Sequence, residues 1–144
     1  MAAITVRDAA SGLYVVGEDI DDGETDAYWL RTPAWARFAQ IFFVMETVGT
    51  SVQLSIRTVP PFDLDDDHII QLREAAAFAA LTSADVTSVV DIGPGVTGIA
   101  DDVTGGAAAD SWASINCILP DILGVAVIAT GANNVYDLSV KFKR

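Results

Sequence analysis

The chain has 144 residues, of which 51% are hydrophobic and 19% are charged, and its formal net charge at pH 7 is −12. This length argues for one domain with a core of its own, and the composition excludes a disordered tail. The acidic balance repels phosphate groups, so it argues against direct binding to nucleic acid. The mean hydropathy of +0.39 is high for a soluble monomer and favours apolar surface buried against a partner.

The first part of the chain predicts short strands separated by turns. Val52, Leu54 and Ile56 alternate with polar residues, which is typical of a strand with one buried face. The run 35–46 is apolar on both faces and predicts a central strand or a strand of a tightly packed sandwich. The acidic stretch 17–26 predicts a loop with a tight turn. The predicted strands cover residues 4–7, 13–16, 27–31, 35–46 and 51–59.

The middle of the chain predicts a helix over residues 65–81. Its first residues are acids that could cap a helix, and Arg-Glu-Ala-Ala-Ala follows, which strongly favours helix. Residues 82–90 predict a short turn or strand. The Gly-, Ala- and Asp-rich segment 93–110 predicts a long flexible loop or arm.

The end of the chain predicts three more strands, over residues 111–119, 123–130 and 135–143. In the last of them, Tyr136, Leu138, Val140 and Phe142 alternate with polar residues. Short strands at this spacing favour a sandwich or barrel. We therefore expect residues 1–144 to form a single mainly β domain, an antiparallel, jelly-roll-like β-sandwich with one helical excursion near residues 66–81. We expect Phe38, Phe42, Phe43 and Tyr136 in its core.

Side chains suited to catalysis are scarce in this sequence. It holds one histidine, His68, and one cysteine, Cys117, and it matches no nucleophile, zinc or phosphate-loop motif. The context favours His68 as a surface residue at a helix start and Cys117 as a small buried hydrophobe. We therefore expect a protein that is not an enzyme and takes no cofactor.

One spacing suggests a metal site. Asp63, Asp65, Asp67 and Glu74 fall at the first, third, fifth and twelfth positions of a calcium-binding loop. His68 occupies the sixth position, where the sharp turn of such a loop requires glycine. The sequence therefore favours an Asp-capped helix start over a calcium site.

Two segments together resemble small β-sandwich structural proteins of tailed bacteriophages. The first has Gly49-Thr50 followed by an alternating strand, and the second has Leu119-Pro120, a strand, Thr130-Gly131 and a final alternating strand. The resemblance covers about residues 26–59 and 115–143, and such proteins usually continue with strands in the middle, where this sequence favours a helix. The resemblance implies a capsid cement (decoration) protein. It would be made in the host cytoplasm and would sit as a homo-oligomer, a trimer, on the major capsid protein at the surface of the virion.

A decoration protein needs surfaces that meet its partners. Aromatic residues are enriched at interfaces, and the only basic cluster is at the end of the sequence. The interface candidates are therefore Trp29, Trp35 and Trp112, together with Lys141, Lys143 and Arg144.

Two other functions stay open. One is a head–tail connector or tail structural protein, and the other is a carbohydrate-binding or adhesion module that would use the three tryptophans as an aromatic platform. A membrane partner is not expected, because no stretch is long enough to span a bilayer and the first residues lack a signal-peptide pattern.

Overall fold

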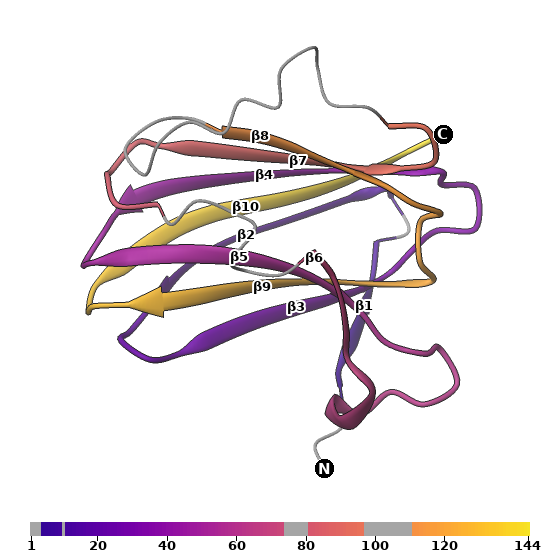
Figure 1. Cartoon of the computed structure of the whole chain (residues 1–144), viewed down its shortest axis with the longest axis horizontal. Coiled ribbons are helices and arrows are strands. Elements are labelled where there is room, and N and C mark those ends of the chain that lie inside the picture. Colours follow the sequence, from indigo (N-terminus) through magenta and orange to yellow (C-terminus); the bar gives the residue numbers. More distant parts are fainter. Residues whose placement is uncertain (1–3, 10, 74–80, 97–110) are drawn as a thin grey trace.

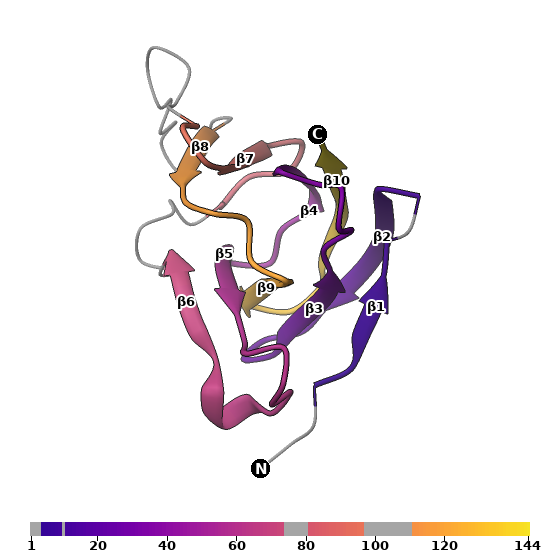
Figure 2. The ribbon, with the colours of Figure 1, turned by 90° about the vertical axis from the view of Figure 1, so that its right-hand side faces the viewer.

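The structure, a computed structural model, describes residues 4–9, 11–73, 81–96 and 111–144. It confirms a mainly β sandwich of two five-stranded mixed sheets (Figure 1; the two layers are seen end-on in Figure 2). The strands are β1 (Val6–Asp8), β2 (Leu13–Ile20), β3 (Thr25–Arg31), β4 (Phe38–Thr47), β5 (Ser51–Thr58), β6 (Ile70–Arg73), β7 (Thr87–Gly93), β8 (Ser111–Asn116), β9 (Ile122–Thr130) and β10 (Asn134–Lys143), with one short 3-10 helix, η1 (Asp66–His68). We name each sheet by its middle strand: the β9 sheet has the order β1-β3-β9-β5-β6, and the β4 sheet has the order β2-β10-β4-β7-β8.

The topology confirms the expected jelly roll. Four antiparallel pairs are nested along the chain: β5 with β6, β4 with β7, β3 with β9, and β2 with β10. Successive pairs lie in opposite sheets, as in a folded-over ribbon wrapped around a core, which is the jelly-roll arrangement. The remaining two strands add to sheet edges in parallel, β1 beside β3 and β8 beside β7.

The alternation predicted for the last strand is confirmed. Tyr136, Leu138, Val140 and Phe142 of β10 are all buried between the sheets, and the residues between them lie on the outside. β4 alternates in the same way, so it is a sandwich strand with one outer face and not a strand covered on both sides. Phe43 is fully buried as expected, whereas the core position expected for Phe42 is wrong, because that side chain points outward and is 40% exposed.

The long helix predicted over residues 65–81 is wrong for the part that the structure describes. The acids cap one 3-10 turn, in which the Asp65 side chain accepts a hydrogen bond from the backbone N–H of Asp67. From Ile70 the chain is strand β6, which pairs with β5. Helix propensity is a weak preference, and here the edge of β5 offers backbone partners that override it. The rest of the predicted helix, residues 74–80, lies outside the described residues.

The acidic stretch 17–26 is also only partly a loop. β2 extends to Ile20 because its backbone pairs with β10, and β3 begins at Thr25, so the turn itself is confined to residues 21–24. Of the predicted loop 93–110, residues 97–110 lie outside the described residues.

The two segments that carry the phage resemblance meet at one end of the sandwich. Asn134 is fully buried there, and its amide binds three backbone groups. Its Oδ1 accepts from the N–H of Gly49 (2.8 Å), while its Nδ2 donates to the carbonyls of Gly131 (2.6 Å) and Ile20 (3.2 Å). Gly131 has a positive φ of 84° and lies so close to Thr50 that a Cβ would overlap the Thr50 backbone. The Gly-Thr turn and the Thr-Gly turn are therefore one packed unit.

Candidate interaction surfaces

The outer face of the β4 sheet has an apolar row across its middle. The strand register aligns one residue from each strand, which we call the central row: Val15, Ser139, Phe42, Val89 and Trp112. Val15 is 64% exposed and Phe42 is 40% exposed, whereas Val89 is buried; Leu13, on the same face of β2, is 50% exposed. Single exposed hydrophobic residues are normal, but a contiguous group of them on a sheet face marks an interaction surface.

Charges of opposite sign lie on the two sides of the central row. Two residues before Ser139 on β10 is Asp137, and two residues after it is Lys141. Glu46 at the end of β4 and Asp19 on β2 lie beyond Asp137, while Lys143 lies beyond Lys141. The only two lysines in the sequence are therefore both on one half of this face.

The acidic half contains two carboxyl groups in contact. A hydrogen bond to Asp137 raises the pKa of Glu46, and the charges of Asp137 and Asp85 raise it further. Within the described residues, no ion pair joins a basic side chain to this pair. The acidic half therefore offers an unmatched negative charge to a partner.

The basic half is ordered by a chain of hydrogen bonds across the sheet. Lys143 Nζ donates to Gln40 Oε1 (3.0 Å), and Gln40 Nε2 donates to Asp91 Oδ1 (2.9 Å). The other oxygen of Asp91 accepts from Trp112 Nε1 (2.6 Å). The candidate residues Lys143 and Trp112 are thus brought into one network on this face, and the half-buried indole of Trp112 is fixed at its edge.

Two further candidates lie together at the end of the sandwich. Trp35 is 38% exposed in the segment between β3 and β4, and the guanidinium carbon of Arg144 lies 5.5 Å from the centroid of its ring. The ring also lies against Gly12, where a Cβ would come within 2.7 Å of Trp35 Cη2. A cation–π contact with an exposed ring contributes little to stability, so this pair is available to a partner.

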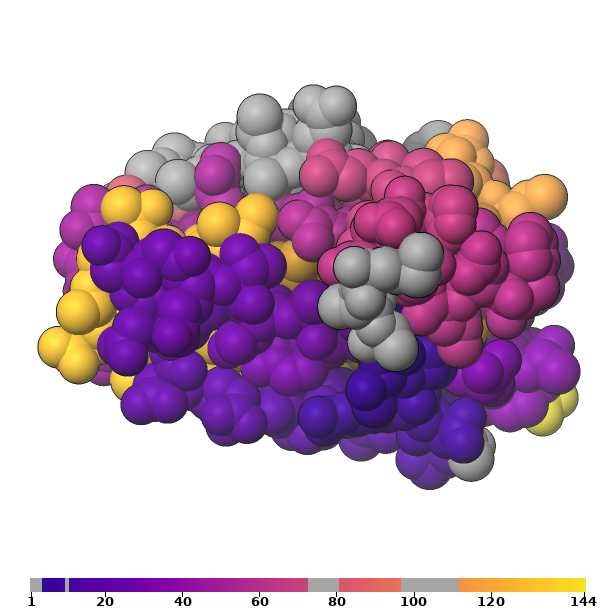
Figure 3. Space-filling model, turned by 90° about the horizontal axis from the view of Figure 1, so that it is seen from below, coloured from indigo at the N-terminus to yellow at the C-terminus, as the bar shows by residue number. Residues whose placement is uncertain are grey.

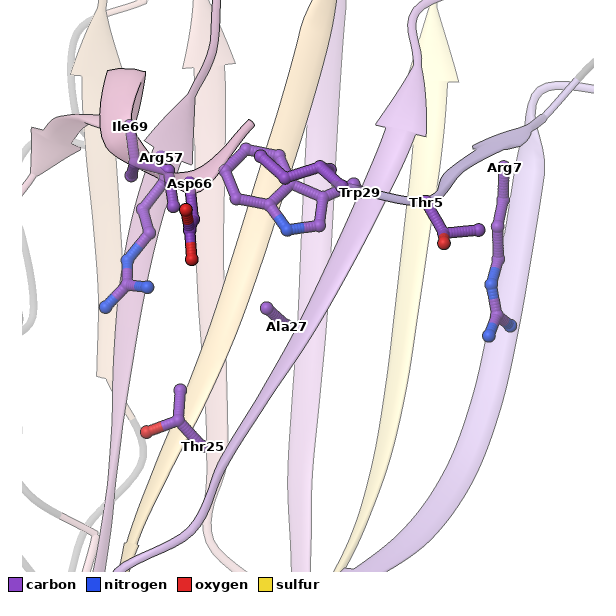
Figure 4. Close-up of a pocket in the computed structure, with 9 residues that line it drawn as sticks. Thr5, Arg7, Thr25, Ala27, Trp29, Arg57, Asp66 and Ile69 are labelled. Carbon is purple, nitrogen blue, oxygen red and sulfur yellow. The ribbon is translucent and has the colours of Figure 1, made fainter. Parts of the chain in front are cut away.

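Trp29 lines a groove on the outer side of the β9 sheet (Figure 4). The groove has a volume of about 420 Å³ and lies where the N-terminal residues contact the segment after β5, through a hydrogen bond from the Ile4 N–H to the Leu64 carbonyl (3.0 Å; Figure 3 shows the two segments side by side). In Figure 4, Arg57 and Arg7 lie on opposite sides of Trp29. The indole is only 6% exposed because it lies flat against Gly124, in a small cluster with Val59 and Ile122.

The three tryptophans do not form a common platform. Trp29 is on the β9 sheet, Trp112 is on the β4 sheet, and Trp35 is in a connection at the end of the sandwich. A sugar ring needs an exposed aromatic face to stack on, and the most deeply placed of the three, Trp29, offers almost none.

The acidic residues after β5 form a hydrogen-bonded turn. His68 Nε2 lies 3.1 Å from Asp63 Oδ2 and 3.8 Å from Asp65 Oδ2, while Asp65 Oδ1 caps the turn. The ligand atoms fall into two overlapping groups, Asp63 with Asp65 and His68, and Asp65 with Asp66 and Asp67. The set predicted from the calcium-loop spacing, Asp63, Asp65 and Asp67, is not assembled as one group, and Glu74 lies outside the described residues.

The sequence interpretation missed a polar network inside the core. Tyr28 of β3 and Tyr136 of β10 join their hydroxyl groups across the two sheets, and Tyr136 donates its proton to Asp26 Oδ2 (2.8 Å). Since Tyr136 uses its only proton on Asp26, Tyr28 must be the donor between the two phenols. Burial raises the pKa of Tyr28 to about 12, and burial together with the hydrogen bond that Tyr136 donates to Asp26 raises the pKa of Tyr136 as well.

Of the central row, only Trp112 was named as an interface candidate, although the sequence held a signal for the other apolar residues. Leu13, Val15 and Phe42 stand where strict alternation requires polar residues. Apolar residues on both faces of a strand are the local signal for such a surface.

No protein-family model matches this chain, and no curated protein sequence matches it. In the part of the chain that the structure describes, no helix has the length and apolar character needed to cross a bilayer.

Proposed function

We propose that this protein is a non-enzymatic structural component of a tailed-phage virion, a decoration protein that attaches as an oligomer to the major capsid protein. The observation that carries the proposal is the exposed apolar surface of Leu13, Val15 and Phe42 on an otherwise complete sandwich. Burying this surface between subunits and against a shell would supply the free energy of attachment. Many copies on a symmetric lattice would then add weak contacts by avidity.

The fold is compatible with this role. Jelly rolls occur in viral capsid proteins and in lectins, so the fold alone does not decide between assembly and sugar binding. The surface supports assembly, because the exposed side chains of Leu13, Val15 and Phe42 lie on one face of the β4 sheet. The tryptophans that a sugar-binding platform would need are dispersed over three parts of the molecule.

The first test is the copy number of the protein in purified virions of the phage that encodes it. Quantitative mass spectrometry would compare its amount with that of the major capsid protein. A ratio near parity, or a simple fraction of parity, is expected for a decoration protein. A handful of copies per particle would instead indicate a connector or tail component, and absence from the virion would overturn the proposal.

A pair of variants tests whether the protein attaches to the virion through the apolar surface of Leu13, Val15 and Phe42. Val15→Asp should remove the protein from virions, because it places a carboxylate within the apolar surface. Phe62→Asp is the matched control, since Phe62 is 88% exposed but lies after β5, away from the β4 sheet. Equal numbers of copies of the two variants per virion would contradict attachment through this face.

A further inference from the structure

The outer face of the β4 sheet is self-complementary. It has an apolar middle, an acidic half with Asp137 and Glu46, and a basic half with Lys141 and Lys143. A face with acids on one side of an apolar row and lysines on the other can pair with a copy of itself if one copy is reversed. An isologous pair, related by a two-fold axis, has this property.

We propose that the outer face of the β4 sheet binds a second copy of this chain, with the strands of the two copies antiparallel and the two-fold axis running along the central row. This inference rests on the self-association included in the proposed function, but not on attachment to a capsid.

The charges select one orientation of the pair. If the axis ran parallel to the strands along β10, the lysines of both copies would face each other, and so would Asp137 of both copies. An axis along β4 would place Lys141 over Asp91 but Asp137 over Thr87, so only one of these two charges would meet its opposite. The axis can instead run across the strands, along the central row. Each strand then lies over the same strand of the second copy, in the opposite direction. A residue two positions before the row on that strand lies over the residue two positions after the row. Lys141 then faces Asp137 of the second copy, and Lys143 lies over Val135, which has Asp19 and Glu46 on the neighbouring strands. Like charges in contact are costly, so the crosswise axis is preferred.

The residues of the central row meet themselves in this arrangement, whereas Leu13, which is level with Lys141, lies over Gly17 of the second copy. Phe42 and Ser139 lie on the axis, so Phe42 packs against Phe42 of the second copy. Sheets that pack face to face align within about 30°, which keeps corresponding strands roughly over one another.

The available area suits a stable pair. With about 3.3 Å per residue and about 4.8 Å between strands, a face of five strands and up to ten residues covers about 600 Å² in projection. A standard interface buries about 800 Å² per partner, so this face and its rim provide most of what is needed. In Figure 2, no described strand lies over the outer side of β2 and β10.

Repulsion between two copies of this acidic chain opposes their association. The chain carries 20 acidic and 8 basic residues, so two random faces would repel each other. This face contains both lysines of the chain, and in the reversed pair they lie opposite the acidic half.

The test measures the mass of the purified full chain by sedimentation equilibrium at about 0.1 M salt. We expect twice the chain mass of 15.2 kDa. Phe42→Asp should give a monomer with an unchanged circular dichroism spectrum, because it places two carboxylates on the axis, while Phe62→Asp should remain a dimer. A monomer or a trimer for the unmodified chain, or a dimer that Phe42→Asp leaves intact, would overturn the inference.

Charge reversal tests the orientation. Lys141→Glu and Asp137→Lys should each weaken the pair at least tenfold, because each variant alters two symmetric contacts. Mixing the two single variants should restore association, since both contacts in the mixed pair again join opposite charges. An equal loss in the mixture would exclude the crosswise axis. Because no virion is involved, these results are independent of the copy-number test, and either proposal can fail alone.

Discussion

At the scale of single residues, the bond between Tyr28 and Tyr136 is the polar link between the two sheets. Tyr136 is fully buried and both donates to Asp26 and accepts from Tyr28, so its loss leaves two groups unpaired. We expect Tyr136→Phe to lower the free energy of unfolding by about 1–3 kcal/mol. Tyr28→Phe should cost less, because Tyr136 keeps its bond to Asp26. Urea denaturation of the two variants checks the order, and a larger loss in Tyr28→Phe would contradict the assigned direction of the bonds.

The same tyrosines predict a loss of stability in alkali. Burial raises the pKa of Tyr28 to about 12 and also raises that of Tyr136, while an unfolded tyrosine ionises near pH 10. Their contribution is therefore complete below about pH 10 and is lost as the pH rises through about 12, because only the unfolded chain ionises in between. Denaturation at a series of pH values checks this. Tyr136→Phe should show a smaller decline, and an equal decline in both proteins would exclude the network as its cause.

Part of this residue-scale description could be predicted from the sequence. The inward positions of β10 followed from its alternation, because burial of one face is a local pattern. Asp26 was assigned to an acidic loop, and nothing local to it indicates that it accepts from a tyrosine 110 positions later. Such a network depends on which strands become neighbours, and that is decided by the whole topology.

At the scale of elements, the packed turns at one end predict a difference between two glycines. Gly131 and Gly23 both have positive φ, 84° and 76°, so alanine is strained at either position. A Cβ at Gly23 would meet nothing within 4 Å, whereas at Gly131 it would overlap Thr50. Gly23→Ala should cost about 1 kcal/mol, and Gly131→Ala should cost at least about 1 kcal/mol more. Thermal melts would show this, and equal costs would mean that the turns are not packed together.

Elements were predicted well where one face is buried and poorly where propensity and pairing conflict. The strand that ends at Thr58 was found because Val52, Leu54 and Ile56 alternate. The segment from Ile70 was mistaken for helix, because its neighbours favour helix locally while the edge of β5 imposes a strand. The extension of β2 to Ile20 was missed for the same reason. Gly and Asp are poor strand formers, but here the backbone of β2 pairs with β10 up to Ile20.

At the scale of the whole molecule, the net charge of −12 predicts a response to salt. Repulsion among the acids destabilises the compact state, and salt screens it. Raising sodium chloride from about 0.05 to 0.5 M at fixed pH should increase the melting temperature by about 3 °C, which corresponds to roughly 1 kcal/mol at this size. A double variant that neutralises the exposed residues Asp67 and Asp121 with asparagine should respond less. A melting temperature that falls with salt would show that attractive ion pairs dominate instead.

The nested strand pairs also have a consequence for biosynthesis. β10 lies between β2 (residues 13–20) and β4 (residues 38–47) in its sheet and pairs with both. The ribosome makes β10 more than 85 residues after the end of β4. While the ribosome has not yet released residues 134–143, the β4 sheet is split in two and its core side chains remain in contact with water. Contacts of such long sequence separation form slowly, because the intervening chain loses much conformational freedom before they are made. Closure of the sandwich therefore awaits emergence of β10 from the exit tunnel, and nascent chains stalled before that point should remain sensitive to protease and dependent on chaperones.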